Sequence, residues 1–193
     1  MKKSLILTSM LALGTSALAL DVNGFVGVGV GGAWNSYDAK FKAAGLTVTE
    51  SDSDSSTLGI LKGGVILDNA HRTSLVYAPV LYKNADIDNY LFAYDYLIPV
   101  NDDSRVSLGL HIGTTSFDGK KDLEGLKDTS FSYGAQVGYI HDITSNVELE
   151  IGAMYTRHDI QANTTKTISG VSGNFEVKVK DTASAFVGIN YKF

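Results

Sequence analysis

Several residue types and patterns are missing from this 193-residue chain. It has no cysteine, which excludes disulfides, thiolate metal sites and a lipoprotein anchor. Its 16 basic residues are outnumbered by 21 acidic ones, which argues against nucleic acid as a partner because phosphate binding needs a basic surface. The mean hydropathy is only +0.04, and no apolar run beyond the N-terminus reaches the about 20 residues of a membrane-spanning helix. Only two prolines accompany 20 glycines and 10 tyrosines, a composition that favours β structure.

The N-terminus has the pattern of a secretory signal peptide. Lys2 and Lys3 form a positive segment, Leu5–Leu13 is apolar, and Ala17-Leu18-Ala19 supplies the small residues that a signal peptidase recognises. The apolar run is too short for a membrane anchor. We therefore expect residues 1–19 to be removed, leaving residues 20–193 as one exported domain in which 14 basic residues stand against 21 acidic ones.

The rest of the chain shows a hydrophobic period of two, which indicates β-strands. Segments of about ten residues match the length of a tilted membrane strand. The sequence thus predicts an all-β fold, an eight-stranded antiparallel up-and-down transmembrane β-barrel. The eight expected strands are Val22–Trp34, Thr57–Leu67, Thr73–Lys83, Asn89–Val100, Arg105–Ser116, Ser130–His141, Val147–His158 and Ala183–Phe193.

The expected connections alternate between short turns and stretches that are mostly longer, as in outer-membrane barrels with short periplasmic turns and long external loops. The external loops are predicted at residues 35–56, 84–88, 118–129 and 159–182. The acidic, serine-rich stretch Glu50–Ser56 is interpreted as solvated loop. A calcium site there is the weaker alternative, because the glycine and terminal glutamate of known calcium loops are missing. Ile168–Val179 alternates in a way that predicts a hairpin above the membrane.

The two faces of the expected strands differ in a way that indicates contact with lipid. One face carries apolar and aromatic residues without charge, and the other carries small and polar residues, the reverse of a soluble barrel. Aromatic residues gather at both strand ends, as in interfacial girdles. The predicted girdle consists of Trp34, Tyr82, Tyr90, Phe131 and Tyr155 at the loop ends and of Tyr96 and Tyr139 at the turn ends. Pro79 lies inside the third strand, where we expect a bulge at Ala78-Pro79.

A group of polar residues is predicted to point into the barrel near mid-height: Lys62, Asp95, His111, Gln136 and Glu150. Buried charges must pair, so we interpret the group as an ionic plug with Lys62 between Asp95 and Glu150. A gated path for ions or protons is the alternative, because charges inside a membrane are often functional. Eight strands leave little lumen, which favours the plug.

Three further motifs suggest other functions but fit the pattern less well. Gly27–Gly32 matches G-x-G-x-x-G, yet these glycines lie within a strand and no helix is expected after them, so nucleotide binding is not indicated. Gly32-Ala33-Trp34 matches the lipocalin G-x-W, but the charge-free face contradicts a soluble barrel. His158-Asp159 lies at the outer rim, with Ser116 and Ser130 as candidate neighbours, an arrangement that an outer-membrane lipid A enzyme would require.

The mature chain resembles the small outer-membrane β-barrel superfamily, which includes the OmpA transmembrane domain, OmpX and the Opa adhesins. Gly188, Tyr191 and Phe193 match the C-terminal strand signal that the barrel-assembly machinery recognises in this superfamily. The resemblance implies an outer-membrane location, contact with membrane lipid and lipopolysaccharide, and no cofactor.

The function that we expect is a structural or adhesin-like role, with an extracellular ligand bound through the external loops. Catalysis is not expected. A narrow pore for small or hydrophobic solutes and a lipid A-modifying enzyme are the alternatives, and a soluble periplasmic barrel is a weaker one.

Overall fold

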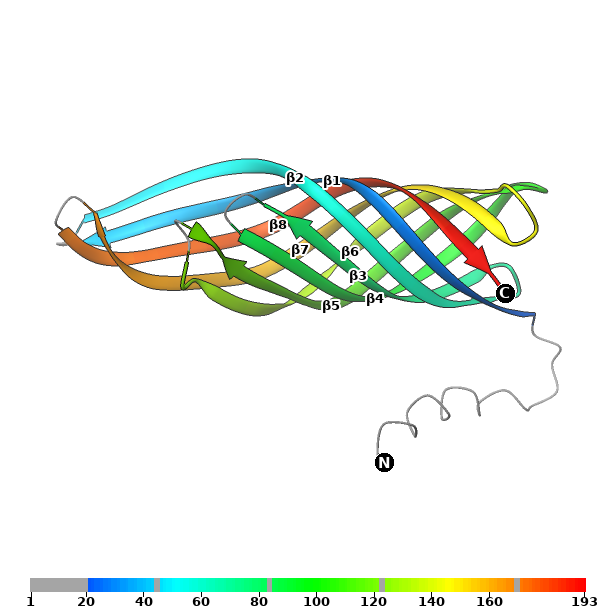
Figure 1. The fold of residues 1–193 in the computed structure, drawn as a ribbon, viewed down its shortest axis with the longest axis horizontal. Coiled ribbons are helices and arrows are strands. Elements are labelled where there is room, and N and C mark those ends of the chain that lie inside the picture. The colour runs from blue at the N-terminus through cyan, green and yellow to red at the C-terminus, as the bar shows by residue number, and fades with distance from the viewer. Residues whose placement is uncertain (1–20, 44–45, 83–84, 122–123, 169–170) are drawn as a thin grey trace, which may run out of the picture.

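The computed structural model describes residues 21–43, 46–82, 85–121, 124–168 and 171–193. The predicted signal peptide, residues 1–19, lies outside the described residues. The chain forms one closed barrel in which each strand pairs with its neighbours in sequence and β8 pairs with β1 (Figure 1). In the described part of the chain, no helix is long and apolar enough to cross a membrane. The strands are β1 (Val22–Ala43), β2 (Leu46–Leu67), β3 (His71–Leu81), β4 (Ala85–Asn101), β5 (Ser104–Gly119), β6 (Lys127–Asp142), β7 (Val147–Ile168) and β8 (Val171–Lys192).

The short turns lie at one end of the barrel, together with both ends of the described chain (Figure 1). The turn from β2 to β3 places Asp68 and Asn69 at φ 50° and 53°. Asp and Asn tolerate this left-handed conformation better than other residues with a side chain, which explains the Asp-Asn pair at the tip. The amide of Ala70 donates to the carbonyl of Leu67 and closes the turn at 3.1 Å.

Four strands are much longer than predicted, so the expected external loops at residues 35–56 and 159–182 are wrong. The expected loop at residues 84–88 is also wrong, because residues 85–88 belong to β4. β1 and β2 stay paired up to Ala43 and Leu46, and β7 and β8 stay paired up to Ile168 and Val171. The acidic stretch Glu50–Ser56, interpreted from the sequence as loop, belongs to β2. We call the upper parts of these strands the protruding sheet: residues 35–43, 46–56, 159–168 and 171–182. In Figure 1 this sheet extends to the left beyond β3–β6.

Pro79 interrupts one strand ladder but produces no bulge, contrary to the prediction. The pairs Leu58↔Val80 and Leu61↔Tyr77 keep the same register on both sides of the interruption. The pairing of β3 with β4 continues through Pro79 without a shift. Proline has no amide hydrogen to donate, so the β2–β3 ladder loses its bonds locally while its register stays unchanged.

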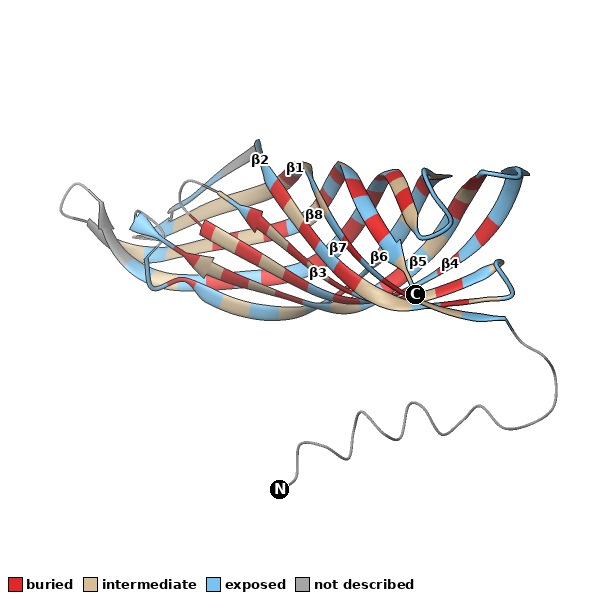
Figure 2. Ribbon diagram, turned by 45° about the vertical axis from the view of Figure 1, so that its right-hand side comes forward, coloured by how far each residue is buried: buried red, intermediate tan, exposed pale blue. Residues whose placement is uncertain are grey.

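The outward side of the barrel carries a belt of apolar residues. We define the belt as the outward positions between Trp34, Tyr90, Phe131 and Tyr155 at one border and Tyr96, Tyr139 and Tyr191 at the other. None of these positions is Asp, Glu, Lys or Arg. Buried and exposed residues alternate along the strands (Figure 2). Large exposed residues of the belt include Val26, Val28, Leu61, Leu75, Phe92, Leu108, Leu110, Ile112, Tyr133, Val137, Ile151, Val187 and Ile189.

The alternation reverses its polarity above the belt. On β7, Tyr155 faces outward and Thr156 inward, but a few residues further Asp159 faces outward and Ile160 inward. On β8, Val177 and Val179 are buried inside. The protruding sheet thus has polar residues outside and apolar ones inside, as expected of β structure surrounded by water. Along the belt the interior contains charged and polar residues but also a buried apolar cluster of Phe25, Ile66, Leu97 and Ile140, so the predicted rule of polar residues inside holds there only in part.

Candidate functional site

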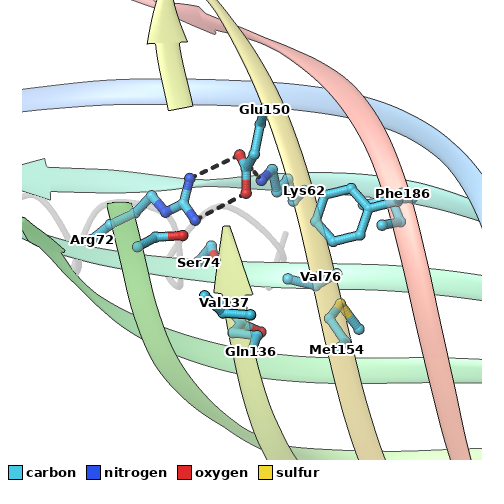
Figure 3. A pocket seen from close by; sticks show the side chains of 11 residues that line it. Lys62, Arg72, Ser74, Val76, Gln136, Val137, Glu150, Met154 and Phe186 are labelled. Atoms are coloured by element: carbon cyan, nitrogen blue, oxygen red, sulfur yellow. Dashed lines mark hydrogen bonds and ion pairs between the residues drawn. The ribbon is translucent and has the colours of Figure 1, made fainter. Parts of the chain in front are cut away.

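Four buried charged side chains, Lys62, Arg72, Asp95 and Glu150, form an ionic cluster inside the barrel. Figure 3 shows Lys62, Arg72 and Glu150. Arg72 lies opposite Asp95 in the β3–β4 ladder, and its Nε is 2.9 Å from Oδ2 of Asp95. Its two terminal nitrogens donate to the two oxygens of Glu150 at 3.0 and 3.2 Å. Lys62 Nζ lies 2.5 Å from Oε2 of Glu150. Two cations therefore balance two carboxylates, which is the condition for keeping charges buried.

His111 and Gln136 extend this cluster into a hydrogen-bonded network. Gln136 donates from Nε2 to Oδ1 of Asp95 at 2.6 Å, and its Oε1 lies 3.2 Å from Nδ1 of His111. The other ring nitrogen of His111 is 3.0 Å from the hydroxyl of Thr156. All five residues of the predicted plug thus lie in one network. The predicted contact of Lys62 with Glu150 is present, but the cation that contacts Asp95 is Arg72 instead of Lys62.

Arg72 was missed because the third strand was predicted to begin at Thr73, two residues after its actual start at His71. A signal for it was present in the sequence. The predicted plug contained two carboxylates and one lysine, and a buried group of that kind needs a second cation. Arg72 is the nearest basic residue to the predicted start of that strand.

A second ionic cluster closes the end of the barrel where the short turns lie. Arg105 Nη2 is 2.6 Å from Glu148 and 2.7 Å from Asp142. Lys192 Nζ is 3.2 Å from each of the same two carboxylates. Asn190 joins the two clusters, because its Nδ2 donates to Glu150 at 2.8 Å and to Glu148 at 3.3 Å. Again two cations balance two carboxylates.

Glycines leave the room that these side chains need. At Gly109, an added Cβ would collide with the carboxylate of Asp95. At Gly152, it would lie 2.5 Å from the ring of Phe186, which itself covers Lys62. Small residues on one strand therefore face large or charged ones on the next, which explains the many glycines inside so narrow a barrel.

Above the ionic cluster the interior is filled by apolar side chains. Leu58, Ile87, Phe117 and Ile160 are almost fully buried there, and Leu126 from the β5–β6 connection packs against the same cluster. Between this cluster and the ionic network lies a cavity of only 20 Å³, lined by Lys62, Arg72, Ser74, Val76, Gln136, Glu150, Met154 and Phe186 among others (Figure 3). Such a volume holds about one water molecule. The geometry is that of a filled barrel.

A chain of hydrogen bonds runs around the inner wall near the upper border of the belt. Thr115 donates to Asn89 at 2.7 Å and lies 2.6 Å from Ser132. Ser132 Oγ lies 3.2 Å from Nδ1 of His158, and the other ring nitrogen of His158 is 2.9 Å from the hydroxyl of Thr182. Thr182 in turn donates to Asn35. The chain thus joins β4, β5, β6, β7, β8 and β1 side by side.

The partners of His158 differ from those that an enzyme at this rim would need. The ring of His158 contacts the hydroxyls of Ser132 and Thr182. These partners are not the expected neighbours Ser116 and Ser130. Both ring nitrogens contact hydroxyl groups, and no carboxylate orients the ring among the described residues. His158 is 5% exposed and Ser132 is 0% exposed. This is a buried polar network that ties strands together.

No group of three or more His, Asp or Glu side chains that could hold a metal ion occurs in the part of the chain that the structure describes. The side chains of residues 50–52, part of the acidic stretch considered for calcium, lie outside the described part.

Solved structures with the same arrangement of strands settle the fold. The chain superposes on neisserial surface protein A with a TM-score of 0.62 at 16% identity, covering 88% of this chain and 97% of the other. For OprG of Pseudomonas aeruginosa the TM-score is 0.63 at 18% identity, with 88% and 96% covered. The chain has the fold of the small outer-membrane β-barrel proteins. OprH of P. aeruginosa gives 0.55 at 18% identity, with 89% and 99% covered. No protein-family model matches the chain, and no curated protein sequence matches it.

Within this outer-membrane barrel fold, six of the seven predicted girdle residues point outward and are exposed: Trp34, Tyr90, Tyr96, Phe131, Tyr139 and Tyr155. Tyr82 does not belong to them. It is partly buried against the apolar cluster inside the upper barrel, and its hydroxyl has no hydrogen-bond partner among the described residues. This burial, with Asp54 nearby, raises the pKa of the Tyr82 hydroxyl. Tyr82 follows the end of β3, so strand alternation could not predict its direction.

The three residues of the predicted assembly signal lie in or next to β8, the strand that closes the outer-membrane barrel. Tyr191 and Phe193 point outward and are exposed, and Gly188 faces Glu150 across the β7–β8 ladder. The amide of Phe193 donates to the carbonyl of Gly24 at 2.9 Å, and the amide of Gly24 donates to the carbonyl of Phe193 at 3.1 Å. The last residue thus takes part in closing the ring between β8 and β1. Recognition of these residues by an assembly machinery stays a prediction.

Proposed function

We propose that the protein is an outer-membrane barrel whose role is contact with partners outside the cell, made by the protruding sheet. The belt would lie in the hydrocarbon core of the membrane, with lipid and lipopolysaccharide around it, since it lacks charge and is bordered by aromatic residues. Gly188, Tyr191 and Phe193 would serve assembly. The protein of the same fold that is named a neisserial surface protein agrees with a role at the surface.

The protruding sheet is the observation that carries this proposal. Residues 159–168 of β7 alone extend the strand by roughly 30 Å, at about 3.3 Å per residue. This length is ordered by strand pairing, and cross-strand ion pairs such as Lys180–Asp38 at 2.7 Å and Lys178–Asp159 at 3.6 Å lie on it. A barrel that served only to fill the membrane would need no such extension. Rigid elements are good supports for a binding surface.

Removal of the protruding sheet tests the proposal. We expect that replacing residues 37–52 and residues 160–179 by Asn-Gly turns, at the paired positions Ser36–Ser53 and next to Asp159, leaves the barrel assembled. Cells carrying the shortened barrel should lose the attachment to host-cell and protein-coated surfaces that the full chain confers, down to the level of cells without the barrel. Attachment is measured by counting retained cells.

The control for this experiment is the shift in gel mobility on heating in SDS, which both barrels should show. If the shortened barrel shows this shift and confers as much attachment as the full chain, contact through the protruding sheet is excluded. Equal attachment with and without the full chain would exclude the proposed function altogether.

Conduction of solutes receives less support from the interior. Two balanced ionic clusters and an apolar cluster fill the described lumen, and the cavity between them has room for about one water molecule. The break in the β2–β3 ladder at Pro79 lies beside buried Leu58 and Ile60, which are packed and leave no passage in the described part.

Catalysis on lipid A is also not proposed, because Ser132 and His158 are buried inside the wall. We expect overexpression of the chain to leave the mass of lipid A unchanged, and His158→Ala to leave it unchanged as well. Mass spectrometry of extracted lipid A makes this comparison, with cells lacking the barrel as the control. A new lipid A species that disappears in His158→Ala would establish the enzyme instead.

A further inference from the structure

The protruding sheet has two open edges. The β6–β7 ladder ends at Ser132↔His158, whereas the β7–β8 ladder continues to Ile168↔Val171. On the other side, the β2–β3 ladder ends at Thr57↔Leu81, whereas β1 and β2 stay paired up to Ala43↔Leu46. Above these levels β7 and β2 each pair on one side only. Open edges present unpaired backbone groups that accept another strand.

The backbone groups of β7 that face the open edge can be identified. The amide of Gln161 donates to Oδ2 of Asp128 on β6 at 2.7 Å, so this amide points away from β8. Because the direction alternates along an antiparallel strand, the amides and carbonyls of Asn163 and Thr165 point to the same side. Their backbone groups have no partner on that side within the described ranges of the chain. A strand placed there would find a row of donors and acceptors.

The two edges differ in charge. The β2 edge contains Glu50, Asp52 and Asp54 within five residues, whereas residues 160–165 of β7 contain no charged residue. Like charges directly opposite each other destabilise a strand pair. Two β2 edges would therefore repel each other, and charged residues on an edge are a known protection against such pairing. The β7 edge carries no such protection in this stretch.

The direction in which β7 runs from the membrane decides whether a second copy in the same membrane or in a facing membrane could pair with this edge. In every barrel of one membrane β7 runs outward, so two copies in the same membrane would present their β7 edges in the same direction. Two copies in facing membranes present them in opposite directions. An antiparallel pair of identical strands obeys two-fold symmetry, and each residue of one copy then meets the symmetry-related residue of the other.

We propose that the β7 edges of two copies on adjacent cells pair antiparallel around Thr164 and Thr165, joining the two protruding sheets and holding the cells together. This proposal rests on the proposed function and names the partner as a second copy of the chain. In this register Asn163 lies opposite residue 165 or 167, and Lys166 of each copy lies opposite residue 162 or 164, so that the two lysines are not directly opposite each other. Both inner faces lie on the same side of the joined sheet.

Variants with opposite charges on the β7 edge, carried by two populations of cells, test the pairing. We expect cells that carry the wild-type chain, in a host with short lipopolysaccharide, to clump and settle. The variants Asn163→Glu/Thr165→Glu and Asn163→Lys/Thr165→Lys should each lose this clumping, because like charges would then meet. A mixture of the two variant populations should clump again, in aggregates that contain both. Settling rate and two-colour microscopy measure these outcomes.

The matched control is Ser55→Glu on β2, an exposed position, which should clump like the wild type. All variants should show the heat-dependent gel shift of an intact barrel. The pairing is wrong if the wild type does not clump, if the glutamate variant clumps unchanged, or if the mixture stays dispersed. Wild-type cells that attach to surfaces without clumping would keep the proposed function and overturn only the pairing.

Discussion

Arg72→Met is expected to lower the stability of the barrel by about 3–5 kcal/mol, the usual cost of leaving a buried charge without its partner. Arg72 is 2% exposed and is the residue that contacts both carboxylates of the ionic cluster. Without it, Asp95 keeps only the hydrogen bond from Gln136 as a described side-chain partner. The temperature at which the folded band disappears on SDS gels, and the urea midpoint in lipid vesicles, should both fall.

Two further variants separate this effect from a general loss of packing. Lys62→Met should cost less, because Glu150 keeps both bonds from Arg72 and Asp95 keeps its own. Arg72→Met/Asp95→Asn should recover part of the stability, since it removes the charge that lost its partner. Neither variant should raise conductance in planar bilayers, because the apolar cluster above remains. If Lys62→Met proved more damaging than Arg72→Met, the assigned pairing would be wrong.

Leu110→Arg is expected to destabilise the barrel in lipid by about 2–4 kcal/mol, the cost of arginine on the lipid face near the bilayer midplane. Leu110 is 67% exposed and occupies the middle of the belt on β5. On a soluble protein, the same change at so exposed a position would be nearly neutral. Urea titration of the barrel refolded into lipid vesicles measures the difference in the free energy of unfolding.

Thr114→Arg on the same strand and the same face is the matched control. It lies level with Phe131, at the upper border of the belt, where the cost should fall to about 0–1 kcal/mol. A pronounced difference between the two variants would locate the belt in the membrane. Equal and small effects of both would show that the outward face does not contact lipid.

The sequence was sufficient to predict the eight strands, because a charge-free face with a period of two is typical of strands that contact lipid. The same reasoning failed above the belt for a physical reason. In β8, Phe175, Val177 and Val179 still alternate, but the apolar side has changed from outside to inside. The expectation that apolar residues point outward therefore applies only to the belt. For the same reason, the acidic stretch of β2 was interpreted as solvated loop.

Three of the four charged members of the ionic cluster were predicted, together with the contact between Lys62 and Glu150, but Arg72 and its pairing with Asp95 were not. Strand alternation places Lys62, Asp95 and Glu150 inside, yet which cation reaches which carboxylate depends on strand stagger around the ring. Arg72 lies opposite Asp95 in the β3–β4 ladder, and β3 and β4 are joined where the amide of Tyr82 donates to the carbonyl of Ala85 at 3.0 Å. The expected start of β3 at Thr73 lay two residues after its actual start at His71, and this was enough to hide Arg72.

The reversal of polarity at the upper border of the belt has a mechanical consequence. If the barrel sank by a few ångströms, Asp88, Arg157 and Asp181 would enter hydrocarbon; if it rose, belt residues such as Tyr139 and Tyr191 would enter water. Either displacement costs free energy, so the vertical position of the barrel is held from both sides. A pull on the tip of the protruding sheet would then be resisted by the whole bilayer around the barrel, and the outer membrane would bear the load.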